Sequence, residues 1–167
     1  HDSLFIHERI PFEKFNIPVL PLWHYRYDKE NLENLLRIAN SLTQSIVLKK
    51  NLTNNDLPLG LNLTNNNFKL CFGCQCYINL QFLEKLESKY TITNLVNVIT
   101  CRSDRCGLER IMGMLFCMEY PNVIKINSLV GNIHKHYKAF LYNYDEYYFD
   151  FQNKRILHKI VKVWTGR

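Results

Sequence analysis

The segment Cys101-Arg-Ser-Asp-Arg-Cys-Gly-Leu-Glu-Arg-Ile-Met-Gly113 begins a helix that carries charges at its start and apolar residues along one side. The apolar stripe recurs at helical spacing and consists of Leu108, Ile111, Met112, Leu115 and Phe116. Ser103 or Asp104 is expected to cap the helix. Three arginines and two carboxylates surround this start, where backbone N–H groups and the helix dipole favour a negative partner. The pattern predicts one wall of a polar pocket.

The segments around this helix predict helices that alternate with strands. Residues 28–42 carry apolar residues at helical spacing, with Asp28 as the N-cap, and residues 77–90 predict a second amphipathic helix. Residues 91–100 fit either a short helix or a strand, whereas three prolines between positions 10 and 21 predict an extended segment. Strand-like runs lie at Ser3–His7 and Lys159–Trp164. We therefore expect an α/β fold with a mixed sheet covered by about three main helices.

The length of the chain limits its organisation. A chain of 167 residues is long enough for a single domain, residues 1–167, with one core. Residues 49–68 are rich in Asn, Thr and Leu and predict a long loop, which is either a flap over a site or an insertion without a role. The chain begins at His1 rather than at a Met and has strand-like runs near both ends, so we expect a piece of a longer protein.

Charge and hydropathy limit the kinds of molecule that the protein is expected to bind. A net charge of +6 and a pI of about 9.0 indicate a mild preference for anions. Lys and Arg are scattered rather than clustered, so nucleic acid is not the expected partner. No apolar run approaches the roughly 20 residues that span a bilayer, and the sequence shows no secretory signal. We expect a cytoplasmic protein without a membrane segment.

The six cysteines leave three alternatives open. Cys71-x-x-Cys74 followed by Cys101-x4-Cys106 loosely resembles a zinc ribbon, although the second pair is widely spaced for one. Disulfides would need an oxidising compartment such as the secretory lumen, which two Asn-Leu-Thr sequons favour. Buried thiols in a reducing compartment are the simplest interpretation.

Short motifs along the chain carry a resemblance to a known family. They are His1-Asp2-Ser3-Leu-Phe-Ile, Cys71-Phe72-Gly73-x-Gln75-x-Tyr77-Ile78, Asp104-Arg105-x-x-x-Glu109-Arg110-Ile111, Ser128-Leu-x-Gly131-Asn-Ile-His134, Tyr144-x-Glu146-Tyr147 and Lys162-Val-Trp-Thr-Gly-Arg167. Their order resembles the acceptor-side, C-terminal half of GT-A-type glycosyltransferases, in particular a group found in large viruses and bacteria.

The resemblance implies transfer of a sugar from a nucleotide-sugar donor to a carbohydrate or another hydroxyl acceptor. Such enzymes hold the donor diphosphate in an N-terminal half, with an Asp-x-Asp motif and a divalent cation, Mn or Mg. This chain contains no Asp-x-Asp. The resemblance therefore implies the acceptor-side part of a longer catalytic domain, inactive alone and, for a viral protein, located in the host cytoplasm.

The resemblance also suggests a proton acceptor. An inverting transfer needs a carboxylate that takes the proton of the acceptor hydroxyl. Glu109 is similar in placement to the base of inverting GT-A enzymes, and Asp104 is the second candidate. The structural alternative for Glu109 is an ion pair with Arg105, four residues earlier on the helix.

Basic residues and the chain start are candidates for the donor side. Arg102, Arg105 and Arg110 suit the phosphate oxygens of a departing diphosphate. The alternative for all three is a solvated helix start, and for Arg110 it is the preferred interpretation. Asp2 would border the donor site. His134 would complete the coordination of the cation, its alternative being a hydrogen-bonded structural histidine.

Polar and aromatic residues are candidates for holding the sugar. Gln75 and Tyr77 follow the Gly73 turn and would bind sugar hydroxyls, and Trp23 or Tyr25 would stack on an apolar sugar face. Two other classes stay open. A basic nucleic-acid-binding module would bind in a strongly salt-dependent way, and a zinc-stabilised interaction domain would unfold in a chelator.

Overall fold

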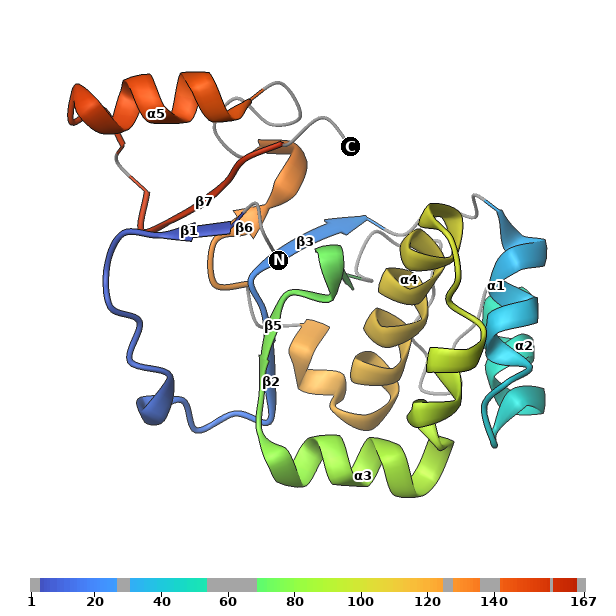
Figure 1. Cartoon of the computed structure of the whole chain (residues 1–167). Helices are drawn as coiled ribbons and strands as arrows, with labels where there is room; N and C mark the ends of the chain where they lie inside the picture. The colour runs from blue at the N-terminus through green and yellow to red at the C-terminus, as the bar shows by residue number, and fades with distance from the viewer. Residues whose placement is uncertain are drawn as a thin grey trace. The chain divides into compact units, whose positions relative to one another are not determined.

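The computed structural model describes residues 4–26, 31–53, 69–124, 128–135, 142–156 and 158–164 (Figure 1). The strands are β1 (Leu4–Ile6), β2 (Val19–Pro21), β3 (Trp23–Arg26), β4 (Lys69–Cys71), β5 (Cys76–Ile78), β6 (Gly131–Asn132) and β7 (Ile160–Lys162). The α-helices are α1 (Leu32–Ala39), α2 (Ser45–Thr53), α3 (Leu80–Tyr90), α4 (Arg102–Glu119) and α5 (Tyr144–Gln152). Short 3-10 helices are η1 (Phe12–Lys14), η2 (Phe72–Cys74), η3 (Ile92–Asn97), η4 (Pro121–Ile124) and η5 (Ile133–Lys135).

The chain divides into two compact units. Unit 1 consists of His1–Asn16 and Asn132–Arg167, and unit 2 of Ile17–Gly131. The prediction of a single domain remains a prediction.

Helix α4 is the central element of unit 2 and packs against α1, β4 and η2. Its apolar side is buried, with Ile111 and Leu115 fully inaccessible. Gly113 lets the helix approach the backbone of β4, because a Cβ atom there would lie 3.0 Å from Leu70 Cα. The Glu119 carboxylate, near the C-terminal end of α4, binds Lys85 and Lys89 of α3 at 2.9 and 2.6 Å.

Two small sheets complete unit 2. β2 pairs with β5 in an antiparallel ladder that sets Leu20 opposite Tyr77. β3 pairs antiparallel with β4, with His24 opposite Cys71, in a three-stranded sheet of order β4-β3-β6. The N–H groups of Leu129 and Val130 donate to the carbonyls of Pro21 and Leu22. The segment after α4 is thereby fixed beside the start of β3.

Unit 1 joins segments from both halves of the chain. β1 pairs antiparallel with β7, with Phe5 opposite Val161. Its buried core consists of Tyr142, Tyr147, Val161 and Val163, with Phe5 and Trp164 packed against it. Helix α5 begins with a capping box between Asn143 and Glu146.

The structure confirms the α/β class and both terminal strands, and it corrects several details. Among the described residues, three small sheets stand where one mixed sheet was predicted, and η1 lies within the predicted extended segment. The helix predicted over 77–90 begins at Leu80, because the Asn79 side chain caps it by accepting the N–H of Phe82. The helix predicted over 28–42 spans Leu32–Ala39, and Asp28 lies outside the described residues.

The other boundary corrections concern α4 and the predicted loop. Helix α4 begins at Arg102 with Cys101 as N-cap, so Ser103 and Asp104 lie inside its first turn. Residues 49–53 of the predicted loop 49–68 form the end of α2, where Leu48 and Leu52 bury one side. The remainder, 54–68, is outside the described residues.

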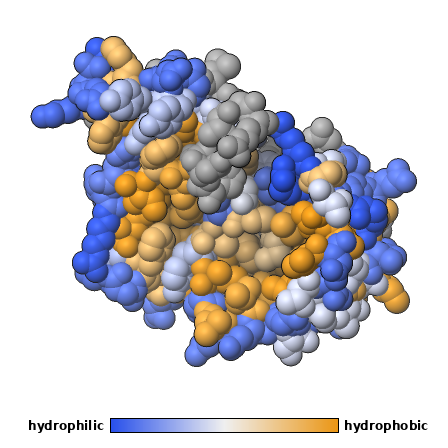
Figure 2. Space-filling view, viewed as in Figure 1, coloured by the Kyte–Doolittle hydropathy of each residue, from blue (hydrophilic) through white to orange (hydrophobic). Residues whose placement is uncertain are grey.

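Apolar side chains also reach the surface of unit 2. Figure 2 shows them over the region of α3, where Leu80 and Leu83 are among the exposed large hydrophobic residues. Among the described residues, no helix combines the length and the apolar character needed to cross a membrane.

Candidate functional site

Glu109 lies on α4 and its side chain is half-buried. The hydroxyl of Tyr25, from β3, donates to Glu109 Oε2 at 3.2 Å. Burial, and then the negative charge of Glu109, raises the pKa of the Cys74 thiol in η2. Glu109 therefore lies between β3 and the η2 turn, where a phenol orients its carboxylate.

Both carboxylate oxygens of Asp104 are hydrogen-bonded at the start of α4. Its Oδ2 accepts the backbone N–H groups of Thr100 and Cys101 and the hydroxyl of Thr100, and its Oδ1 accepts a 2.5 Å ion-paired hydrogen bond from Arg37. The bonds from Thr100 and Cys101, led by that from the Thr100 backbone, outweigh burial and hold the pKa of Asp104 well below its ordinary value. Such a carboxylate is a weak proton acceptor, and its observed contacts are those of a helix cap.

The three arginines near the helix start differ in environment. Arg102 and Arg105 are exposed. Arg110 is only 7% exposed, donates from Nη1 to the Cys106 carbonyl at 2.9 Å, and lies 5.7 Å from the centre of the Tyr25 ring. Of these three arginines, Arg110 is therefore the one whose side chain is buried.

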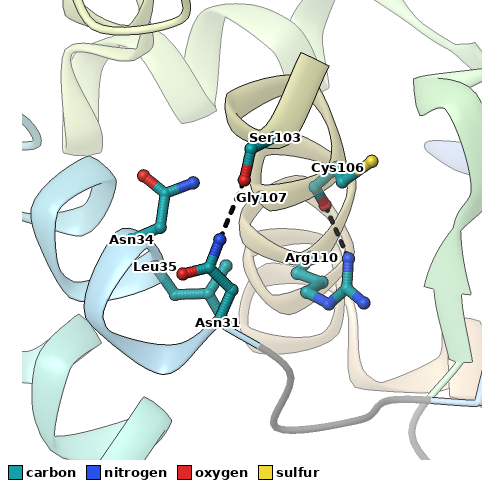
Figure 3. A pocket seen from close by; sticks show the side chains of 7 residues that line it. All are labelled: Asn31, Asn34, Leu35, Ser103, Cys106, Gly107 and Arg110. Atoms are coloured by element: carbon teal, nitrogen blue, oxygen red, sulfur yellow. Dashed lines mark hydrogen bonds between the residues drawn. The ribbon is translucent and has the colours of Figure 1, made fainter. Parts of the chain in front are cut away.

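A pocket of about 180 Å³ lies between α1 and α4 (Figure 3). Its lining residues are Asn31, Asn34, Leu35, Ser103, Cys106, Gly107 and Arg110. Asn31 has a left-handed backbone conformation with φ of 59°, and its Nδ2 donates to Ser103 Oγ at 2.8 Å. Of the residues predicted for the site from sequence, Arg110 lines this pocket and Glu109 does not.

The sugar-binding candidates have different surroundings. Gln75 is 8% exposed, folds against Gly73, and has both side-chain amide atoms buried without a hydrogen-bond partner. Gly73 has φ of 62°, a conformation that glycine adopts at little cost. Tyr77 is half-buried on β5. Trp23 is 0% exposed in the core of unit 2, so its ring has no face open to a ligand.

The predicted metal ligand lies in unit 1. His134 is exposed on η5, and its backbone N–H donates to Asn132 Oδ1 at 2.9 Å. Within the described part of the chain, no group of three or more His, Cys, Asp or Glu residues is placed to hold a metal ion. Asp2 lies outside the described residues, and the Mn or Mg cation remains a prediction.

All six cysteines are thiols, and Cys71 and Cys117 are buried. Cys71 Sγ lies 3.6 Å from the Gln75 carbonyl oxygen. A hydrogen bond from Cys71 stabilises the Cys76 thiolate and lowers the pKa of Cys76, whereas the same bond and burial raise the pKa of Cys71. The β4–η2–β5 turn thus contains thiols of unequal reactivity.

Asn31, Asn34 and Ser103 were not recognised from the sequence as site residues. A partial signal was present, because Asn34 and Arg37 are three residues apart on α1 and share one side of it, whereas Asn31 precedes the helix. Comparisons with protein-family models, with curated proteins and with solved structures found no match.

Proposed function

We propose that the protein is the acceptor-side part of a glycosyltransferase that moves a sugar from a nucleotide-sugar donor to a hydroxyl acceptor. The supporting observation is the half-buried carboxylate of Glu109, held by the Tyr25 hydroxyl beside the η2 turn. Three of the motifs that carry the resemblance lie at η2, at the start of α4 and at 128–131. They are distant in sequence, and all of them contact β3 or its neighbours in unit 2.

In the proposed reaction the acceptor oxygen forms a bond to the anomeric carbon while the bond to the nucleoside diphosphate breaks. Glu109 takes the proton of the acceptor hydroxyl, so that the attacking oxygen does not become a positively charged oxonium ion as it bonds to the anomeric carbon. Tyr25 positions the Glu109 carboxylate through its 3.2 Å hydrogen bond. A divalent cation bound in the donor half would neutralise the departing diphosphate.

Gln75 is the proposed contact to the sugar. A carboxamide has two donors and two acceptor lone pairs, and buried groups of this kind nearly always have partners. Neither side-chain amide atom of Gln75 has one. Hydroxyls of a bound sugar, which both donate and accept, would satisfy it.

The test uses the full-length protein and a panel of nucleotide sugars, with release of nucleoside diphosphate as the readout. Glu109→Gln is expected to lower kcat by about a hundredfold or more, because the amide cannot take a proton. The matched control is Glu84→Gln, an exposed carboxylate on α3 in the same unit, which should leave kcat unchanged.

Circular dichroism and urea midpoints establish that both variants fold. The proposal fails if Glu109→Gln retains full activity, or if the wild-type protein releases no nucleoside diphosphate from any donor of the panel in the presence of Mn or Mg.

A further inference from the structure

The turn between β4 and β5 holds three thiols within six residues. It runs from Cys71 at the end of β4, through η2, to Cys76 at the start of β5. Gly73 and Cys74 both have left-handed backbone conformations, with φ of 62° and 53°. Two consecutive residues of this kind reverse the chain tightly. The ends of the turn therefore approach each other, and Cys71 Sγ lies 3.6 Å from the carbonyl oxygen of Gln75, the residue before Cys76.

Strand pairing fixes both ends of this turn. Cys71 is the last residue of β4, which pairs with β3, and Cys76 is the first residue of β5, which pairs with β2 (Figure 1). The N–H of Leu22, between β2 and β3, donates to the Gln75 carbonyl at 2.8 Å. Within this frame the thiol of Cys71 donates a hydrogen bond to the sulfur of Cys76. The two sulfur atoms are therefore in direct contact before any reaction.

The thiols of the turn differ in reactivity. Cys76 is only half-buried, and the hydrogen bond from Cys71 lowers its pKa, so more of it is thiolate, the form that reacts with peroxides. Cys71 is 0% exposed, and the same bond and burial raise its pKa. Burial and the charge of Glu109 raise the pKa of Cys74. Cys76 is thus the sulfur of this turn that an oxidant attacks first.

We infer that Cys71 and Cys76 form a reversible disulfide when a hydroperoxide oxidises the protein, with Cys76 as the attacking thiol and Cys71 as the resolving thiol. The Cys76 thiolate attacks one oxygen of hydrogen peroxide, so that an S–O bond forms, the O–O bond breaks and hydroxide leaves. The sulfur of Cys71 then displaces the hydroxyl of the sulfenic acid, which leaves as water with the Cys71 proton while the S–S bond forms. Two thiols and one peroxide thereby give one disulfide and two molecules of water.

The contact between the two sulfur atoms selects this pair. Sulfur atoms that are already hydrogen-bonded need to approach by only about 1–2 Å to reach the S–S bond length of about 2.05 Å. Rotation of the half-buried Cys76 side chain can supply much of that movement. The inference depends on this contact and does not require the proposed transfer reaction.

Peptide mapping of the intact chain tests the pair. The reduced protein is treated with hydrogen peroxide, its remaining thiols are blocked with N-ethylmaleimide, and trypsin then releases residues 70–85, whose cysteines are Cys71, Cys74 and Cys76. We expect this peptide to lose two hydrogen atoms and to carry a single maleimide, on Cys74. Dithiothreitol added before the blocking step should restore three maleimides.

Three variants assign the roles of the thiols. Cys74→Ser is the matched control, because it removes a thiol from the same turn and should leave the yield of the disulfide within about twofold of the wild type. Cys76→Ser should abolish the disulfide. In Cys71→Ser combined with Cys74→Ser, the serine hydroxyl at position 71 can still donate to Cys76, but no thiol of the turn can resolve its sulfenic acid, which dimedone should trap.

Circular dichroism establishes that each variant folds, and the mapping of the wild type does not depend on any variant. The inference is overturned if the wild-type peptide still carries three maleimides after a peroxide treatment that oxidises the exposed Cys101 and Cys106. It is also overturned if the wild-type bond includes Cys74, or if Cys76→Ser forms a disulfide in this peptide as readily as the wild type does.

Discussion

The contact between α4 and β4 predicts that Gly113→Ala destabilises the protein. A Cβ atom at this position would lie 3.0 Å from Leu70 Cα and 3.2 Å from Cys71 N. Both atoms belong to the backbone of a strand that is hydrogen-bonded to β3, so they cannot rotate away as a side chain can. The helix and the strand must separate by a few tenths of an ångström, and the apolar contacts beside them loosen.

The expected magnitude combines two opposing effects. Overpacking a core by one methyl group costs about 1–3 kcal/mol. Alanine gains about 1 kcal/mol over glycine in a helix interior. The free energy of unfolding should therefore fall by about 1 kcal/mol in Gly113→Ala. Gly107→Ala is the comparison, because its close neighbour, Ile38 Cδ1 at 2.5 Å, is the end of a flexible side chain. That variant should be close to neutral.

Urea unfolding followed by circular dichroism measures both variants. A midpoint for Gly113→Ala at or above that of the wild type would refute the reasoning. So would a larger loss in Gly107→Ala, because the approach to β4 would then not be the limiting contact.

Three further predictions concern acid stability, capping and thiol reactivity. Burial opposes ionisation of Glu119, but hydrogen bonds from Lys89, Tyr90 and Lys85 outweigh it and lower its pKa to about 2. The contribution of Glu119 to the stability of the fold is therefore complete above the unfolded pKa near 4.5 and is lost as the pH falls towards 2. In urea titrations, Glu119→Gln should cost about 2 kcal/mol at pH 7 and almost nothing near pH 2, and a difference that is independent of pH would contradict this. Asn79→Ala should lower the free energy of unfolding by about 1 kcal/mol through loss of the bond to Phe82, and Asn79→Asp, which retains an acceptor, should preserve it. Iodoacetamide should modify Cys76 faster than Cys74, because the pKa of Cys76 is lowered and that of Cys74 is raised, and peptide mass spectrometry would show the reverse order if the pKa directions were wrong.

Local patterns predicted much of the secondary structure. Strands β1 and β7 follow from short apolar runs, and α4 follows from an unambiguous helical stripe. Helix α3 was predicted too, but from residue 77; the N-cap signal of Asn79, which immediately precedes the amphipathic run, was missed. Helix α2 was not predicted from the sequence, because its lysines and asparagine interrupt the apolar pattern and its two buried leucines, Leu48 and Leu52, give a weak signal.

Long-range pairing could not be read from the sequence. Nothing local specifies that β1 pairs with β7 or that Tyr25 contacts Glu109, because such pairings depend on how distant segments pack. Asp104 illustrates the same limit. Its position at the helix start is equally compatible with a base and with a cap, and only the contacts of its two oxygens with Thr100, Cys101 and Arg37 favour the cap.

The ladder between β1 and β7 has a consequence for biosynthesis. The segments of unit 2 between Ile17 and Gly131 are all available before Ile160 is translated, so this unit can collapse while the ribosome is still working. Strand β1 lacks this partner until β7 emerges. The nascent chain therefore carries an unpaired edge during the whole interval between the synthesis of β1 and that of β7, and a stall before Ile160 would leave that edge open to mispairing.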